Sequence, residues 1–142
     1  MYVFSSTYSQ ERSRYYDNRQ RARQEPHKYL SIIIDGMDQS KTDLPHLARK
    51  NKAACNLWVL RTHITGALVH GRRSYAFVDV NMWPHDSNLS INILLQILLD
   101  QKDSLPPILY LQLDNCFREN KNRYFLGFIA LLVYHKVFKE VK

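Results

Sequence analysis

The stretch ILYLQLDNC, residues 108–116, decides the fold that this chain is expected to adopt. Its first six residues, 108–113, are apolar apart from Gln112 and predict a strand, and Asp114 stands directly at the strand's end. Before it comes LSINILLQILLDQ (89–101), whose apolar residues recur three and four positions apart and predict a helix. Since a helix that links two strands of one sheet crosses right-handed, strand 108–113 should lie parallel to an earlier strand.

Three earlier strands are predicted. YLSIII (29–34) is rich in β-branched residues and is closed by Asp35-Gly36. Residues 57–69 and 74–83 are both strand-like and predict a hairpin that turns at His70-Gly71-Arg72-Arg73. The polar and basic residues 40–56 between these strands predict a long connection.

The remaining elements are helical. Asp86 or Ser87 can accept the free N–H groups of helix 89–101, and a last helix is predicted from Arg118 to about Lys139. Its apolar face comprises Phe125, Phe128, Ile129 and Leu132, and Tyr124, Leu131 and Val133 widen that face and predict burial on more than one side. The fold class is therefore α/β, with a mixed sheet in the order strand-strand-strand-helix-strand-helix.

Composition and charge favour a polyanionic partner. The chain has 142 residues, which predicts one domain, and its net charge of +7 attracts phosphates at long range. Residues 1–28 form a basic leader. Two interpretations of it are open: a helix from about Gln10 to Gln24 that is ended by Pro26, and an exposed segment.

Membrane insertion is not expected because the most apolar run, residues 124–133, is too short to span a bilayer.

The cysteines and histidines predict neither a disulfide framework nor a zinc site. The two cysteines, Cys55 and Cys116, lie far apart, and the six histidines are scattered along the chain. A secretory signal peptide is not expected from the residues that follow Met1. These features are typical of an intracellular protein, and the basic charge is compatible with a nuclear one.

Sequence motifs exclude several common enzyme classes. The four glycines form no GxGxxG, GxxxxGK[ST] or GxSxG pattern, so dinucleotide binding, P-loop hydrolysis and the serine-hydrolase elbow are unsupported.

Asp79 lies in the middle of the second hairpin strand, and its side chain is expected to point outward or to be hydrogen-bonded.

Two carboxylates follow strands that are expected to be neighbours. Ligands of such sheets gather beyond the carboxyl ends of the parallel strands, where Asp35 and Asp114 both stand. Carboxylate oxygens suit Mg²⁺ or Mn²⁺, and Asp38 is a further candidate ligand. Taken singly, Asp35 is more typical of a turn residue in Asp35-Gly36, and Asp114 of a helix cap. Their matching positions make a shared catalytic metal site as well supported as these two roles.

Two segments resemble a transposon-derived domain family of unassigned function, whose members look like ribonuclease H-like, DDE-transposase folds. The first is Asp35-Gly36-Met37-Asp38-Gln39, and the second is Asp114-Asn115-Cys116 with Asn120-Lys121-Asn122. The resemblance covers roughly residues 25–142. It implies a ribonuclease H-like sheet with Asp35 on the first strand and Asp114 after the fourth.

The resemblance also implies a final strand and a helix with a third acidic residue, which this sequence does not contain. We therefore expect residues 29–142 to form an incomplete ribonuclease H-like domain from a carboxy-terminally truncated chain, and its catalysis to be weak or absent. An exposed sheet edge could then promote self-association.

The resemblance assigns roles around the two carboxylates in metal-dependent phosphodiester chemistry on nucleic acid, with DNA the expected substrate. Lys121 and Arg123 would contact backbone phosphates, and Gln39, Asn115 and Asn120 would support the carboxylates. Two alternatives stay open. One is a non-catalytic basic module that holds nucleic acid through the leader and the 41–52 segment, including Lys41 and Lys50. The other is a degenerate transposon-derived product without activity.

Overall fold

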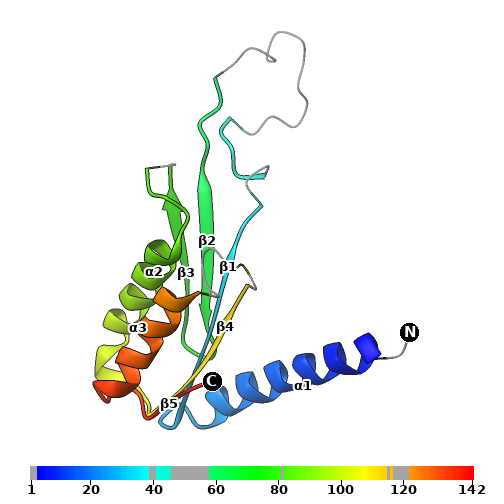
Figure 1. The fold of residues 1–142 in the computed structure, drawn as a ribbon, viewed down its shortest axis with the longest axis vertical. Helices are drawn as coiled ribbons and strands as arrows, with labels where there is room; N and C mark the ends of the chain where they lie inside the picture. Colours follow the sequence, from blue (N-terminus) through cyan, green and yellow to red (C-terminus); the bar gives the residue numbers. More distant parts are fainter. Residues whose placement is uncertain (1–2, 39–40, 46–57, 81, 115, 117–121) are drawn as a thin grey trace.

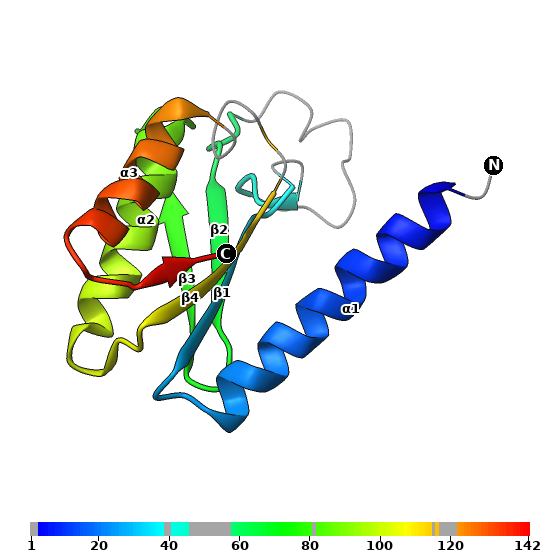
Figure 2. The ribbon, with the colours of Figure 1, turned by 60° about the horizontal axis from the view of Figure 1, so that its bottom comes forward.

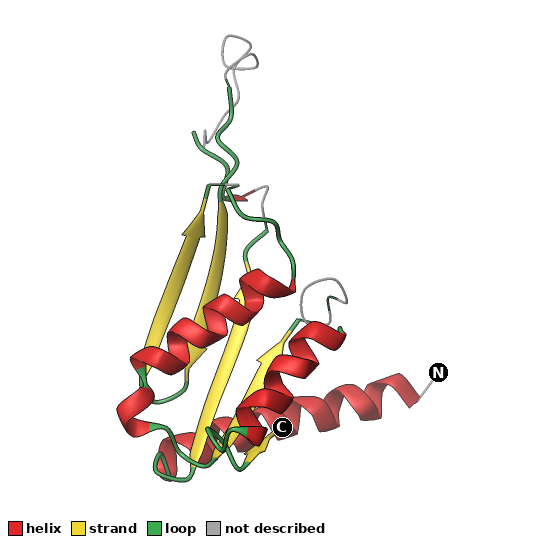
Figure 3. Ribbon diagram, turned by 60° about the vertical axis from the view of Figure 1, so that its left-hand side comes forward, coloured by secondary structure: helices red, strands yellow, loops and turns green. Residues whose placement is uncertain are grey.

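The computed structural model describes residues 3–38, 41–45, 58–80, 82–114, 116 and 122–142. These residues form an α/β fold in which one mixed, five-stranded sheet carries α2 and α3 on one face (Figures 1 and 3). In chain order the elements are α1 (Val3–Gln24), β1 (Tyr29–Gly36), β2 (His63–Val69), β3 (Arg73–Asp79), α2 (Ser87–Asp100), the 3₁₀ turn η3 (Lys102–Ser104), β4 (Ile108–Leu113), α3 (Arg123–Tyr134) and β5 (Glu140–Val141).

The strand order across the sheet is β3-β2-β1-β4-β5. β1 is antiparallel to β2 and parallel to β4, so the predicted parallel pairing of 108–113 with an earlier strand is confirmed. β2 and β3 form the predicted hairpin, although both strands are shorter than expected. Gly71, at φ 76°, lies in the connection between them and permits the tight turn there.

The hydrophobic core lies between the sheet and the two helices α2 and α3. Alternate residues of β1 point into it, since Leu30, Ile32 and Ile34 are buried. The predicted apolar stripe of α2 meets this face, with Ile93, Leu94, Ile97 and Leu98 buried and Leu89 partly buried. The Asp86 carboxylate caps α2 by accepting the N–H groups of Asn88 and Leu89, as the sequence predicted.

The end of the last helix and the sheet edge differ from the prediction. α3 ends at Tyr134 rather than near Lys139, because Lys136 adopts a left-handed conformation with φ 57°. The N–H groups of Lys136 and Val137 then donate to the carbonyls of Val133 and Leu132, which is the Schellman arrangement.

After this turn Phe138 enters the core and Glu140–Val141 pairs with β4. Figure 2 shows β5 along the outer side of β4. The prediction that the sheet lacks its final strand is therefore wrong. A two-residue strand carries too little periodicity to be read from sequence.

The outer face of α3 also departs from expectation. Phe125 and Leu132 are buried and Phe128 and Ile129 partly buried, as predicted. The residues expected to widen the buried face are instead exposed, with 61% of Tyr124, 53% of Leu131 and 37% of Val133 accessible. α3 therefore packs on one side only, because the described sheet and α2 contact a single stripe of it.

α1 packs near the opposite face of the sheet, at the end where β1 begins, and runs away from it (Figures 1 and 3). It is longer than the predicted helix but ends at Gln24, before Pro26, as expected. Its contact includes buried Ala22 and a set of polar bonds, in which the two ring nitrogens of buried His70 bond the Tyr15 hydroxyl, at 3.1 Å, and the Ser31 hydroxyl, at 2.9 Å. The basic leader is thus a helix anchored at its carboxyl end.

Burial lowers the pKa of His70, and Arg19 and Arg23 on α1 lower it further. The folded state therefore holds this histidine neutral, whereas in the unfolded chain it titrates near its ordinary value of 6.5. Between the two pKa values of His70 the unfolded state binds more protons than the folded state. The contribution of His70 to stability is therefore fully present above about pH 6.5 and is lost as the pH falls.

We expect the free energy of unfolding in urea to be lower at pH 5.5 than at pH 7.5, and His70→Gln to reduce that difference. The exposed His135 provides the control, since His135→Gln should keep the full difference. Equal free energies of unfolding at both pH values in the unsubstituted protein would contradict this prediction.

Arg72 ties together the three connections at the end of the sheet opposite the two carboxylates. Its guanidinium donates to the Pro26 carbonyl before β1 at 2.9 Å, to Gln101 after α2 at 3.1 Å, and to both the hydroxyl and the carbonyl of Ser104. This set of bonds uses the planar fork of Arg, which presents several donors in fixed directions.

Candidate active site

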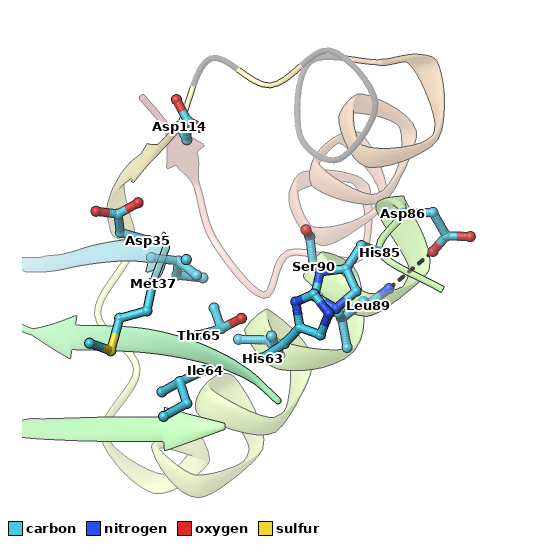
Figure 4. A pocket seen from close by; sticks show the side chains of 13 residues that line it. Asp35, Met37, His63, Ile64, Thr65, His85, Asp86, Leu89, Ser90 and Asp114 are labelled. Carbon is cyan, nitrogen blue, oxygen red and sulfur yellow. Dashed lines mark hydrogen bonds between the residues drawn. The ribbon is translucent and has the colours of Figure 1, made fainter. Parts of the chain in front are cut away.

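Asp35 and Asp114 lie at the carboxyl ends of the neighbouring strands β1 and β4. The last paired positions of β1 and β4 are Ile34 and Leu113, and each aspartate is the next residue of its chain. Both line one pocket of about 200 Å³ at the carboxyl ends of the two strands (Figure 4). The prediction that these two residues converge is therefore confirmed, although their roles as metal ligands and catalytic groups stay predictions.

The pocket has the character of an oxygen-rich site open to solvent. Asp35 and Asp114 are both exposed, so solvent has access to this side of the pocket. Thr65 on β2 and Ser90 on α2 add hydroxyl groups to the lining. A pair of carboxylates with room for water is the donor set that Mg²⁺ and Mn²⁺ prefer. Within the described residues, no group of three or more His, Cys, Asp or Glu is placed to hold a metal ion.

A pair of closely packed histidines, whose ring planes are tilted by 43°, forms the other wall of this pocket. The rings of His63, at the start of β2, and His85, before α2, have centroids 3.7 Å apart (Figure 4). Asp79 lies behind them, with its Oδ2 atom 3.7 Å from His85 Nε2, and neither of these two buried atoms has a hydrogen-bond partner among the residues that the structure describes. Asp79 therefore faces inward, and its other oxygen, Oδ1, accepts the Met82 N–H.

The sequence did not reveal this histidine pair, because His63 and His85 belong to different elements with no shared spacing. Burial lowers the pKa of His63, and the neighbouring His85 lowers it further. The lowered pKa favours the neutral imidazole, which is a proton acceptor.

Residues 52–142 match the family described as "Domain of unknown function (DUF7869)". The chain belongs to this family. No curated protein and no solved structure matches the chain. Asp114 and the histidine pair lie inside the region shared with the DUF7869 family, while Asp35 and β1 precede it.

The other predicted site residues are only partly accounted for in this DUF7869 protein. Asp38 and Lys41 are exposed in the segment after β1, and the Asp38 carbonyl accepts the Lys41 N–H at 3.0 Å. Arg123 begins α3, where its guanidinium stacks over the Tyr124 ring at 4.9 Å. Five predicted residues lie outside the described residues: Gln39, Lys50, Asn115, Asn120 and Lys121.

Asn122 is the amide whose role the structure defines. Its side-chain oxygen accepts the N–H groups of Tyr124 and Phe125 and so caps α3. Its Nδ2 atom donates to the hydroxyl of Ser87, the first residue of α2. The amino-terminal ends of α2 and α3 are therefore joined next to the carboxylate pocket.

The described residues include no helix long and apolar enough to cross a membrane.

Proposed function

We propose that Asp35 and Asp114 bind a divalent cation, Mg²⁺ or Mn²⁺, in a ribonuclease H-like domain related to transposases and nucleases, and that the substrate is nucleic acid. The observation that carries this proposal is the position of the two carboxylates, each one residue beyond the paired positions Ile34 and Leu113 and both in one pocket.

The sheet supports the proposed kinship with ribonuclease H-like proteins. The family resemblance implies a chain order of three antiparallel strands, a helix, a parallel strand and a helix, and β1 to α3 follow that order. In the sheet, β1 lies in the centre. The centre of such a sheet brings the ends of β1 and β4 together, which places one carboxylate from each strand at the same edge.

A divalent cation at this position would supply charge stabilisation to a phosphodiester under attack by water or a 3′-hydroxyl. The chain itself would hold the ion through the two carboxylates and admit the substrate through the open side of the pocket. Lys41 and Arg123, both exposed in the segments that follow β1 and β4, are proposed to contact backbone phosphates.

Titration of the metal-free protein with Mn²⁺, followed by calorimetry, tests the site directly. We expect a saturable ion-binding event that Asp35→Asn and Asp114→Asn each weaken by at least about tenfold, because each removes one charged ligand. Asp103→Asn is the matched control, since Asp103 is an exposed carboxylate in η3, before the amino end of β4. Unchanged ion binding in both site variants would rule out the metal site.

A non-catalytic nucleic-acid-binding module is the second candidate, and α1 is the observation that favours it. The helix carries Arg12, Arg14, Arg21 and Arg23 as exposed side chains. Such a module would bind DNA with an affinity that falls steeply with salt concentration. In that case the affinity would be the same with and without Mg²⁺ and in both aspartate variants.

A further inference from the structure

A second, larger cavity adjoins the carboxylate pocket. It has a volume of about 570 Å³ and lies between α2 and the upper part of β2 and β3. His63, His85 and Leu89 are among the residues that line both cavities, so the histidine pair belongs to the wall that they share. The volume is within the range of pockets that hold a small organic group of nucleoside size.

One wall of this cavity is a row of amides. Asn88, Asn92 and Gln96 follow each other at four-residue intervals along α2, which places them on one face of the helix. All three are exposed. Each amide offers both hydrogen-bond donors and an acceptor, and the row therefore presents the mixed pattern found on the edges of nucleobases.

The opposite wall is aromatic. Trp83 is 66% exposed and Phe77 is partly buried, and both line the cavity together with Val78. A large exposed indole beside a cavity provides a flat surface on which a planar ring can stack.

The charges of the lining argue against a phosphate inside this cavity. Among the described residues that line it there is no Lys or Arg, and the carboxylates are those of Asp79 and Asp86. Asp86 is engaged as the cap of α2. A neutral, planar group with hydrogen-bonding edges fits such a lining, whereas an anion would be repelled.

We propose that the cavity between α2 and β3 binds an unpaired nucleobase, stacked on Trp83 and held at its edge by Asn92 and Gln96. The inference rests on the proposed function, because the adjoining pocket of Asp35 and Asp114 is where the phosphate of the same strand would lie. The substrate class it names is single-stranded or locally unpaired nucleic acid.

Tryptophan fluorescence provides the test, because the chain has only two tryptophans and Trp58 can be replaced. In a Trp58→Phe background, with EDTA to remove divalent ions, a short single-stranded oligothymidylate should quench the Trp83 emission in a saturable way. An abasic strand of equal length and charge should leave the emission unchanged, because it carries the same phosphates without bases.

The combined variant Asn92→Ala and Gln96→Ala should weaken the binding of the base-bearing strand about tenfold, a loss of about 1.4 kcal/mol. Gln20→Ala, at an exposed amide of α1, is the matched control and should bind like the background protein. Circular dichroism should show an unchanged helix content, since alanine favours helices.

Equal quenching by the abasic strand, no quenching by either strand, or full affinity in the double variant would each overturn the proposal. These outcomes are separate from a failure of the metal site, since the Mn²⁺ titration is performed without nucleic acid and the fluorescence titration without metal.

Discussion

Phe125→Ala is expected to destabilise the protein by about 3–5 kcal/mol, a large share of the 5–15 kcal/mol that typically holds a domain folded. Phe125 is 2% exposed and lies at the start of α3, where its side chain belongs to the core beneath the sheet. The substitution removes a full aromatic ring and leaves a cavity that the surrounding helices and strands can only partly close. Urea unfolding followed by circular dichroism measures the loss.

The neighbouring Leu126 supplies the control for this substitution. It is 62% exposed on the outer face of α3. Leu126→Ala should change the free energy of unfolding by no more than about 0.5 kcal/mol. Comparable losses in the two variants would show that the outer face of α3 is covered in solution, contrary to the one-sided packing described above.

Arg72→Ala should lower the free energy of unfolding by about 2–3 kcal/mol. The substitution removes four hydrogen bonds that the charged guanidinium donates, and these bonds join three connections of the chain. Because these bonds are partly open to solvent, their combined contribution to the free energy of unfolding is smaller than that of four buried bonds. Loss of Arg72 leaves the carbonyls of Pro26 and Ser104 dependent on water, whereas the Ser104 hydroxyl keeps its bond to the Gln101 carbonyl.

Two variants separate the geometry of this contact from its charge. Arg72→Lys should recover less than half of the loss, since an ammonium group cannot direct bonds to Pro26, Gln101 and Ser104 together. Arg73→Ala should have a small effect, because its exposed pairing with Asp100 is screened by solvent. Equal stability of the Arg72→Lys variant and the unsubstituted protein would contradict the role of the fork.

The parts of the fold that could be predicted are those with strong local signals. Strand β4 has the predicted bounds, and α2 begins at its predicted cap Asp86 with its predicted stripe buried. The end of α3 could not be predicted, because a lysine, Lys136, occupies the left-handed position that glycine usually marks. The apolar residues that follow, Val137 and Phe138, continue the helical pattern and conceal the turn.

The candidate site could be predicted only where topology determines it. The parallel pairing of β1 and β4 follows from the strand-helix-strand order, so Asp35 and Asp114 had to meet. His63 and His85 meet through the course of the chain after β3, where Asp79 accepts the Met82 N–H. No repeat or spacing in the sequence encodes that course, so the second wall of the pocket was missed.

The parallel pairing of β1 with β4 has a consequence for the order of folding. The β2–β3 hairpin closes a short loop, whereas β1 and β4 come from distant parts of the chain and must offset a much larger closure entropy. The two carboxylates meet only through this non-local pairing, so the site requires the complete tertiary fold and cannot exist in an isolated hairpin. A cation bound there would bind the folded state alone and would therefore raise the free energy of unfolding.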